Sequence, residues 1–392
     1  MNAARRPRQL AALIAAQVCL HSAMAGVRMA APLWLLREGH TAAAVGLVLA
    51  LFGVAPVLLA LRAGRLVDRH GYHAALRWSA GLACVGALAA LAASLRPMAG
   101  GPALAMLCLA AGCLGGGANA GLIAIQREAG RLAVDVTDLK RVFSWLGLAP
   151  ALANMVGPLL AGVLIDLAGF AIAFATLAAL PLVALCVGPL IERSVPAGQS
   201  ASRPTSTALD LLREPGLLRL LAFNWVLSTC WDAHNFALPV LAHTRGLSAS
   251  ALGGIFGTFS AAVVAVRLVI PWLAHRLQEA EVLSGAMAVT ALLFAVYPLL
   301  QDAWAMALVA CALGASLGSV QPMIMSTLHQ ITPPERHGQA IALRSMTINA
   351  SSAVMPLVFG TLGGALGVGA LFWLVGAAVG AGSWAARRPL VP

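Results

Sequence analysis

The sequence predicts an all-α membrane protein in which twelve transmembrane helices form two six-helix halves. Three observations predict this class: an apolar composition, twelve apolar runs of membrane-spanning length, and an internal repeat. Of the 392 residues, 60% are hydrophobic and only 10% are charged, and the mean hydropathy is +0.87. A water-soluble domain of this composition would lack the polar residues needed to cover its surface.

The apolar runs are each long enough to cross a bilayer, which takes about 20 helical residues. They cover residues 10–36, 42–62, 76–95, 102–125, 142–165, 170–190, 217–241, 249–274, 280–300, 303–328, 340–361 and 366–385. A segment rich in Ser, Pro, Thr and charge follows the sixth run and is typical of a linker. We therefore expect an N-terminal bundle over 1–190, a cytoplasmic linker over 191–215 and a C-terminal bundle over 216–392.

The basic residues predict the orientation in the membrane. With the N-terminus inside, twenty of the 25 Lys and Arg fall at cytoplasmic ends and loops, as the positive-inside rule requires. We expect a multi-pass protein of a bacterial-type inner (plasma) membrane with both termini in the cytoplasm. The net charge of +11 is spread between apolar runs, which argues against a nucleic-acid partner.

The cysteines predict no chemistry. All seven lie within apolar runs, without metal-ligand or redox spacing. We therefore expect no metal and no other cofactor. Motifs for nucleotide binding or nucleophilic catalysis are also missing from the sequence, so we do not expect an enzyme.

An internal repeat relates the two halves. A shift of 207 residues aligns helices 1 and 2 with helices 7 and 8, and pairs Pro32 with Pro239, Gly39 with Gly246, and Gly46 with Gly253. A shift of 198 aligns helix 5 with helix 11, and pairs Pro158 with Pro356 and Gly162 with Gly360. A shift of 202 aligns helix 4 with helix 10, and pairs Gly112 with Gly314, Gly116 with Gly318, and Asn119 with Gln321.

The most densely charged segment of the chain, 64–77, lies between the second and third apolar runs. It contains the pattern G-x-L-x-D-R-x-G, in which the fixed positions include Gly64, Asp68, Arg69 and Gly71. We expect a tight loop in which both glycines permit a sharp reversal. The pattern resembles the signature loop between helices 2 and 3 of the major facilitator superfamily of transporters. The resemblance implies two halves around a substrate cavity. We expect Arg127, at the cytoplasmic end of helix 4, to pair with Asp68 as part of an inner gate.

The sequence departs from this family in one part of the loop. After Gly71 the family usually carries a basic pair, whereas Tyr72 and His73 stand here.

Helix 5 carries a second element, Gly157-Pro158-Leu159-Leu160-Ala161-Gly162. It resembles the G-P-x-x-G-G element of the drug:proton antiporter branch, and its proline is expected to kink the helix. That branch usually has an arginine within helix 4, which is missing between Gly101 and Gln126. We expect Arg28 to take a similar electrostatic role.

Two equivalent helices each carry a polar stripe, and the resemblance implies that both line the cavity. The stripe of helix 1 contains Gln17, His21, Met24 and Arg28, and that of helix 7 contains Asn224, Ser228, Trp231 and Asn235, with Asp232 beside them. The predicted substrate and proton pathway adds Asn119, Gln321 and Asn349.

Arg28 and Asp232 are expected to form the centre of this pathway. Each lies about nine residues from the outer end of its helix, so at about 1.5 Å per residue they sit at similar depth. We expect Arg28 and Asp232 to pair across the cavity when its outer side closes. The alternative is that each side chain finds its partners within its own half or extends outward. Arginine keeps its proton, so Asp232 is the first candidate proton carrier and His21 the second. Arg267 is interpreted as reaching the membrane interface rather than binding an anion.

The sequence therefore predicts a secondary active transporter working by alternating access. The first hypothesis is proton-coupled efflux of a small, largely apolar compound, driven by the proton gradient. The alternative is an uptake permease for a small organic anion anchored by Arg28, and a third class is a membrane sensor that does not transport. The expected partners are a small-molecule substrate and the lipid bilayer, and the expected state is a monomer.

Overall fold

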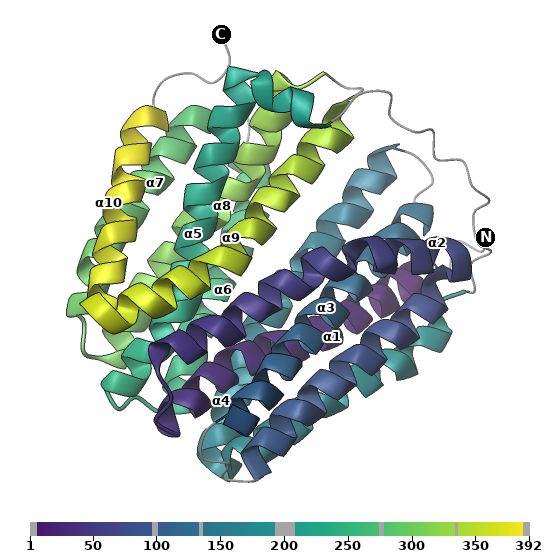
Figure 1. Cartoon of the computed structure of the whole chain (residues 1–392). Coiled ribbons are helices and arrows are strands. Elements are labelled where there is room, and N and C mark those ends of the chain that lie inside the picture. The colour runs from purple at the N-terminus through teal and green to yellow at the C-terminus, as the bar shows by residue number, and fades with distance from the viewer. Residues whose placement is uncertain are drawn as a thin grey trace.

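A computed structural model describes residues 6–95, 101–132, 136–192, 208–273, 278–333 and 336–386. These residues form helices and connecting turns, and no strand occurs among them (Figure 1). The helices of the first half are α1 (Arg6–Arg37), α2 (Ala42–Leu95), α3 (Gly101–Leu132) and α4 (Val136–Val187). Those of the second half are α5 (Pro215–Thr244), α6 (Ala249–Leu273), α7 (Glu279–Val296), α8 (Ala303–Ile331), α9 (His337–Leu366) and α10 (Val368–Ala386). Three short 3-10 helices are η1 (Gly188–Leu190), η2 (Ala208–Arg213) and η4 (Tyr297–Leu299). The middle of the expected linker, 193–207, lies outside the described residues.

The ten α-helices contain twelve helical segments because two of them fold back. α2 has 54 residues and leaves helical geometry at Gly71, where φ is 76°. α4 has 52 residues and does so at Gly169, where φ is 84°. Positive φ is readily adopted by glycine, so one residue is enough to reverse the chain. The twelve predicted runs correspond to these segments, and the predicted fold class is confirmed.

The loop predicted over 64–77 is shorter than expected. Gly64 lies inside the helix with open space around it, and the helix continues to His70. Among the residues of this segment, only Gly71 has positive φ. The expected reversal at Gly64 is therefore wrong, because the turn at Gly71 alone connects the two spans.

The repeat is confirmed by equivalent contacts across the boundary between the halves. Gly46 of α2 packs against the carbonyl of Pro356 in α9, and Gly253 of α6 packs against the carbonyl of Pro158 in α4. A Cβ at either glycine would collide with that carbonyl. The same two interfaces contain Gly360 against Ala42 and Gly162 against Ala249. Each half thus contributes the same two surfaces, related by the shifts of 207 and 198 residues.

The expected alignment of helix 4 with helix 10 is out by three residues. Gly115 of α3 packs on the backbone of Phe52, and Gly314 of α8 packs on the backbone of Phe259. Because Phe52 and Phe259 are equivalent under the shift of 207, Gly115 corresponds to Gly314 and the offset is 199 rather than 202. The predicted offset between helices 4 and 10 was wrong because each helix has glycines at several nearby positions. Gln321 is therefore equivalent to Leu122, not to Asn119.

The halves meet at one end of the molecule. The terminal end is defined here as the end where α1 begins and α10 finishes, and the far end as the opposite one. The glycine contacts lie towards the far end, and the halves diverge towards the terminal end (Figure 1). At the far end Asp166 of α4 accepts hydrogen bonds from the backbone NH groups of Ala249, at 3.0 Å, and Ser250, at 2.6 Å. This carboxylate caps the first turn of α6 from the other half.

The outer surface of the bundle is apolar. Leu58, Leu167 and Leu308 are 69%, 79% and 72% exposed, and many other large hydrophobic side chains are exposed with them. Such a surface suits hydrocarbon rather than water. Ten stretches of the described chain are long and apolar enough to cross a membrane, one of which, Leu148–Leu190, contains the break at Gly169. The chain is a multi-pass membrane protein.

Gly253→Ala is expected to lower the melting temperature of the purified protein. The added Cβ would collide with the carbonyl of Pro158, and overpacking of this kind costs about 1–3 kcal/mol. The neighbouring Gly254 faces open space, so Gly254→Ala should leave the melting temperature unchanged or raise it. Thermal unfolding in detergent measures both variants. Equal melting temperatures would contradict the close packing of α6 on α4.

Candidate functional site

A cavity of about 430 Å³ lies between the halves, on the terminal side of the glycine contacts. This volume suits a small organic molecule. The first half lines it with Arg28, Leu122, Pro150, Ala151 and Asn154. The second half lines it with Ser228, Trp231, Asp232, Asn235, Ser260, Val263, Arg267, Gln321, Ile348 and Ser352. A smaller space of about 70 Å³, bordered by Met29, Pro158 and Phe256, shares five of these residues and adjoins the cavity.

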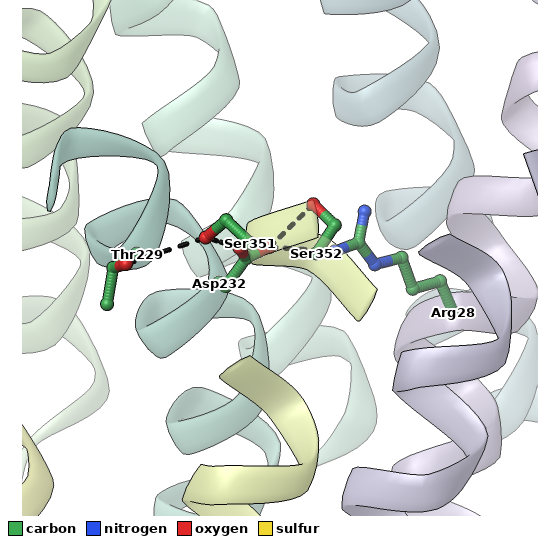
Figure 2. Close-up of polar contacts among 5 residues, drawn as sticks. All are labelled: Arg28, Thr229, Asp232, Ser351 and Ser352. Carbon is green, nitrogen blue, oxygen red and sulfur yellow. Dashed lines mark hydrogen bonds and ion pairs between the residues drawn. The ribbon is translucent and has the colours of Figure 1, made fainter. Parts of the chain in front are cut away.

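An ion pair joins the two halves in the cavity wall. Nη2 of Arg28 on α1 lies 3.8 Å from Oδ1 of Asp232 on α5 (Figure 2). Their side chains are 24% and 3% exposed. The separation exceeds a hydrogen bond, so the attraction is electrostatic and leaves the donors of Arg28 available to another acceptor. The two residues that we expected to face each other across the cavity do so.

Asp232 is also held from its own half. The hydroxyl of Ser351 on α9 donates to Oδ2 at 2.7 Å, and that of Ser352 donates to Oδ1 at 3.0 Å (Figure 2). Thr229 lies one turn earlier on α5, with its hydroxyl 3.5 Å from that of Ser351. Figure 2 shows Ser351 on the side of the carboxylate towards Thr229, and Ser352 on the side towards Arg28. The serines therefore fix its position independently of Arg28.

Half of the predicted pathway residues line the cavity. Those that do are Arg28, Ser228, Asp232, Asn235 and Gln321. The remaining five, which are not part of its lining, are Gln17, His21, Asn119, Asn224 and Asn349. Gln17 is fully buried, and its amide lies 3.4 Å from the ring of His21. The stripe on α1 therefore reaches the cavity at Arg28, while Gln17 is buried and His21 is partly exposed outside the cavity lining.

The sequence interpretation missed several wall residues. Asn154, Ser260 and Arg267 line the cavity, although Arg267 was expected to reach the membrane interface. The signal for these residues was a polar side chain within an apolar run, which on its own does not distinguish a cavity from a packed contact. Ser351 and Ser352 were missed for the same reason.

The inner-gate motif is partly described. Arg127 of α3 donates from Nη1 to the carbonyl of Val67, at 2.5 Å. This contact places the guanidinium next to the backbone of Asp68. The side chain of Asp68 lies outside the part of the chain whose side chains are described, so the expected pair with Arg127 stays a prediction. Arg69 is exposed.

The helix 5 element provides close contacts on two sides. Gly157 packs on the carbonyl of Ser22 in α1, while Gly162 packs on α6 of the other half. Pro158 lies within the α-helix and presents its carbonyl to Gly253. The equivalent Pro356 and Gly360 of α9 make the same kind of contact, so this element packs the halves together at the far end.

The sequence profile of the Major Facilitator Superfamily matches residues 13–301 and 220–391. The chain belongs to the major facilitator superfamily. It is a member of a transporter family and not an enzyme. No curated protein matches the chain in sequence.

Solved structures share the fold of this major facilitator protein at low identity. A POT family transporter in complex with a thioalcohol conjugated peptide is 13% identical, with a TM-score of 0.77 over 96% of this chain and 95% of that one. The nucleoside transporter NupG is 16% identical, with a TM-score of 0.77 over 96% and 98%. A bacterial homolog of the human lysosomal transporter Spinster, in an inward-facing and unoccupied conformation, is 11% identical, with a TM-score of 0.73 over 99% and 98%. These neighbours do not single out the drug:proton antiporter branch.

Arg28→Met is expected to lower the free energy of unfolding by about 1–3 kcal/mol. It leaves the Asp232 carboxylate buried with two hydroxyls as its partners. The loss should be smaller than the roughly 3–5 kcal/mol for a fully buried pair, because Arg28 is 24% exposed. Adding Asp232→Asn should recover most of the loss, since no unpaired charge then remains. Unfolding of the single and double variants measures this, and a double variant less stable than Arg28→Met would contradict the pairing.

Proposed function

We propose that this major facilitator protein moves a small organic anion together with a proton, by alternating access around the Arg28–Asp232 pair. The observation that carries the proposal is this ion pair, which spans the two halves in the wall of a polar cavity. Two arginines line the wall, and Asp232 is the one carboxylate among the described lining residues. Asparagine, serine and glutamine side chains supply further hydrogen bonds. An excess of positive charge and donors favours an anionic solute.

The pair supplies a way to link the anion to a proton. While Asp232 is ionised, it attracts Arg28. A proton on Asp232 removes that attraction and leaves the guanidinium, whose five N–H donors match an oxyanion, free to bind the solute. One proton and one anion then occupy the cavity together, and the charge in the cavity is unchanged. His21 lies outside the cavity lining, which makes Asp232 the better candidate proton carrier.

Loss of the ion pair also loosens the contact between α1 and α5 at the closed end. The proposed transport step opens the far end and closes the terminal end, which requires the glycine contacts and the Asp166 cap to separate. The distribution of arginines supports a cytoplasmic terminal end, and the cavity in this conformation then faces the cytoplasm. An inward proton gradient would drive uptake of the anion.

Proton-coupled efflux of a largely apolar compound is the second candidate. The helix 5 element around Pro158 resembles that of the antiporter branch, and Trp231 offers an aromatic surface in both spaces of the site. The polar side chains around Trp231 favour an anionic solute over a largely apolar one.

Proteoliposomes with a pH dye inside test both candidates. Organic acids added outside should move protons with wild type but not with Asp232→Asn, because the amide cannot carry the proton. His21→Gln is the matched control and should retain coupling. Proton movement with lipophilic cations or neutral compounds, and not with acids, would favour efflux. A protein that accumulates no labelled solute would fit a sensor.

Arg28→Lys tests the anchor separately. Lysine keeps the charge but loses the planar fork that binds an oxyanion through two hydrogen bonds. We expect the apparent affinity for the organic acid to fall roughly ten-fold while proton coupling through Asp232 persists. Uptake kinetics over a range of acid concentrations measure this. Unchanged affinity would exclude bidentate recognition by Arg28.

A further inference from the structure

Two more arginines lie together in the second half, nearer the terminal end than Arg28. Arg267 on α6 lines the cavity. Arg344 on α9 is only 8% exposed and donates a hydrogen bond to the side-chain oxygen of Gln321 on α8, which also lines the cavity. Gln321 therefore connects Arg344 to the cavity wall that Arg267 also lines.

This cluster has donors without acceptors. Arg267 forms no hydrogen bond or ion pair with another described residue, and the Nε groups of Arg267 and Arg344 are both buried and unpartnered. Gln321 supplies the acceptor for Arg344 but carries no charge. Two neighbouring cations in a membrane protein with no described carboxylate beside them are unfavourable unless an anion joins them.

The pseudo-symmetry shows that the scaffold does not need these charges. The first half has Leu122 where the second has Gln321, and Leu146 where the second has Arg344. Position 60, equivalent to Arg267, is alanine. Both halves form six-helix bundles, yet only the second carries polar groups at these three positions. Packing alone therefore does not explain them.

We propose that Arg267, Arg344 and Gln321 form a second oxyanion subsite, so that the cavity binds a small solute with two anionic groups, either carboxylates or phosphate. This inference rests on the proposed function and narrows its substrate class. Arg28 binds one anionic group next to Asp232, and the arginine pair binds the other in the part of the same cavity nearer the terminal end. The arrangement of Gln321 leaves its amide NH₂ available as a third donor beside the two guanidiniums.

The probes are butyrate as a monoanion and succinate, glutarate and inorganic phosphate as anions of higher charge. Isothermal titration calorimetry of the purified protein, at a pH where succinate and glutarate are dianions, measures their affinities. Wild type should bind succinate or glutarate at least roughly ten-fold more tightly than butyrate, because a second charge-assisted contact is added. Arg267→Gln should remove this preference, because it should weaken the binding of succinate and glutarate much more than that of butyrate.

Two further variants guard against misfolding and against a general charge effect. Gln321→Leu installs the residue that the first half has at the equivalent position, and should fold normally while weakening dicarboxylate binding. Arg213→Gln removes the same charge at an exposed position outside the cavity lining, and should keep the preference. Equal affinity for butyrate and dicarboxylates in wild type, or a preference that survives Arg267→Gln in folded protein, would overturn the subsite.

The outcomes separate this inference from the proposed function. Transport of butyrate that depends on Arg28, without any preference for dicarboxylates, would overturn the subsite and leave organic-anion transport in place. Tight dicarboxylate binding that depends on Arg267, in a protein that moves no acid across proteoliposomes, would support the subsite and overturn transport.

Discussion

The buried carboxylate of Asp232 determines how the side chains of the cavity are arranged. A charge buried between transmembrane helices must be paired or hydrogen-bonded, and this one is both. Arg28 reaches it from the other half, while Ser351 and Ser352 hold it from α9. The backbone at Ser352 packs on Gly53 of α2 across the boundary between the halves. The group that sets the charge of the cavity is thus connected to a contact that closes the far end.

The far end owes its closure to small residues repeated by the pseudo-symmetry. Gly46 and Gly253 allow the backbones of facing helices to meet. Gly162 and Gly360 do the same in the same two interfaces, against Ala249 and Ala42. Close approach of this kind depends on shape and not on strong bonds, so it can separate and re-form during a transport cycle. The Asp166 cap on α6 adds a polar contact at the same end. The terminal end, where the halves diverge, leaves the cavity accessible.

Much of this architecture could be predicted from the sequence because membrane constraints act on long, simple patterns. The twelve apolar runs and the repeat follow from hydrophobicity and from the spacing of glycines and prolines. The facing of Arg28 and Asp232 also required the resemblance to the major facilitator superfamily, which implied that helices 1 and 7 line the cavity, and the helical rise then gave both residues a similar depth. The register of helix 4 against helix 10 could not be fixed, because several glycines offered competing alignments. The role of Arg267 depended on how α6 is rotated, and a single arginine near a helix end carries no information about that rotation. The serines around Asp232 look like ordinary polar residues until α9 is placed beside α5.

The two arginine sites divide the cavity by charge. Near the closed end of the cavity, Asp232 and an anion from solution compete for Arg28. Nearer the terminal end, no described carboxylate of the protein competes with an anion for Arg267 and Arg344. A solute held at both would draw the halves together around itself, since Arg28 belongs to the first half and the other two to the second. Binding energy would then contribute to closing the terminal end.

The most direct measurement is the number of protons taken up when succinate binds to the purified protein. Calorimetry in buffers of different ionisation enthalpy gives this number for wild type and for Asp232→Asn. If the anion replaces Asp232 as the partner of Arg28, wild type takes up roughly one proton per succinate, and the variant takes up none. Succinate binding to wild type without proton uptake would contradict the coupling of anion and proton through the Arg28–Asp232 pair.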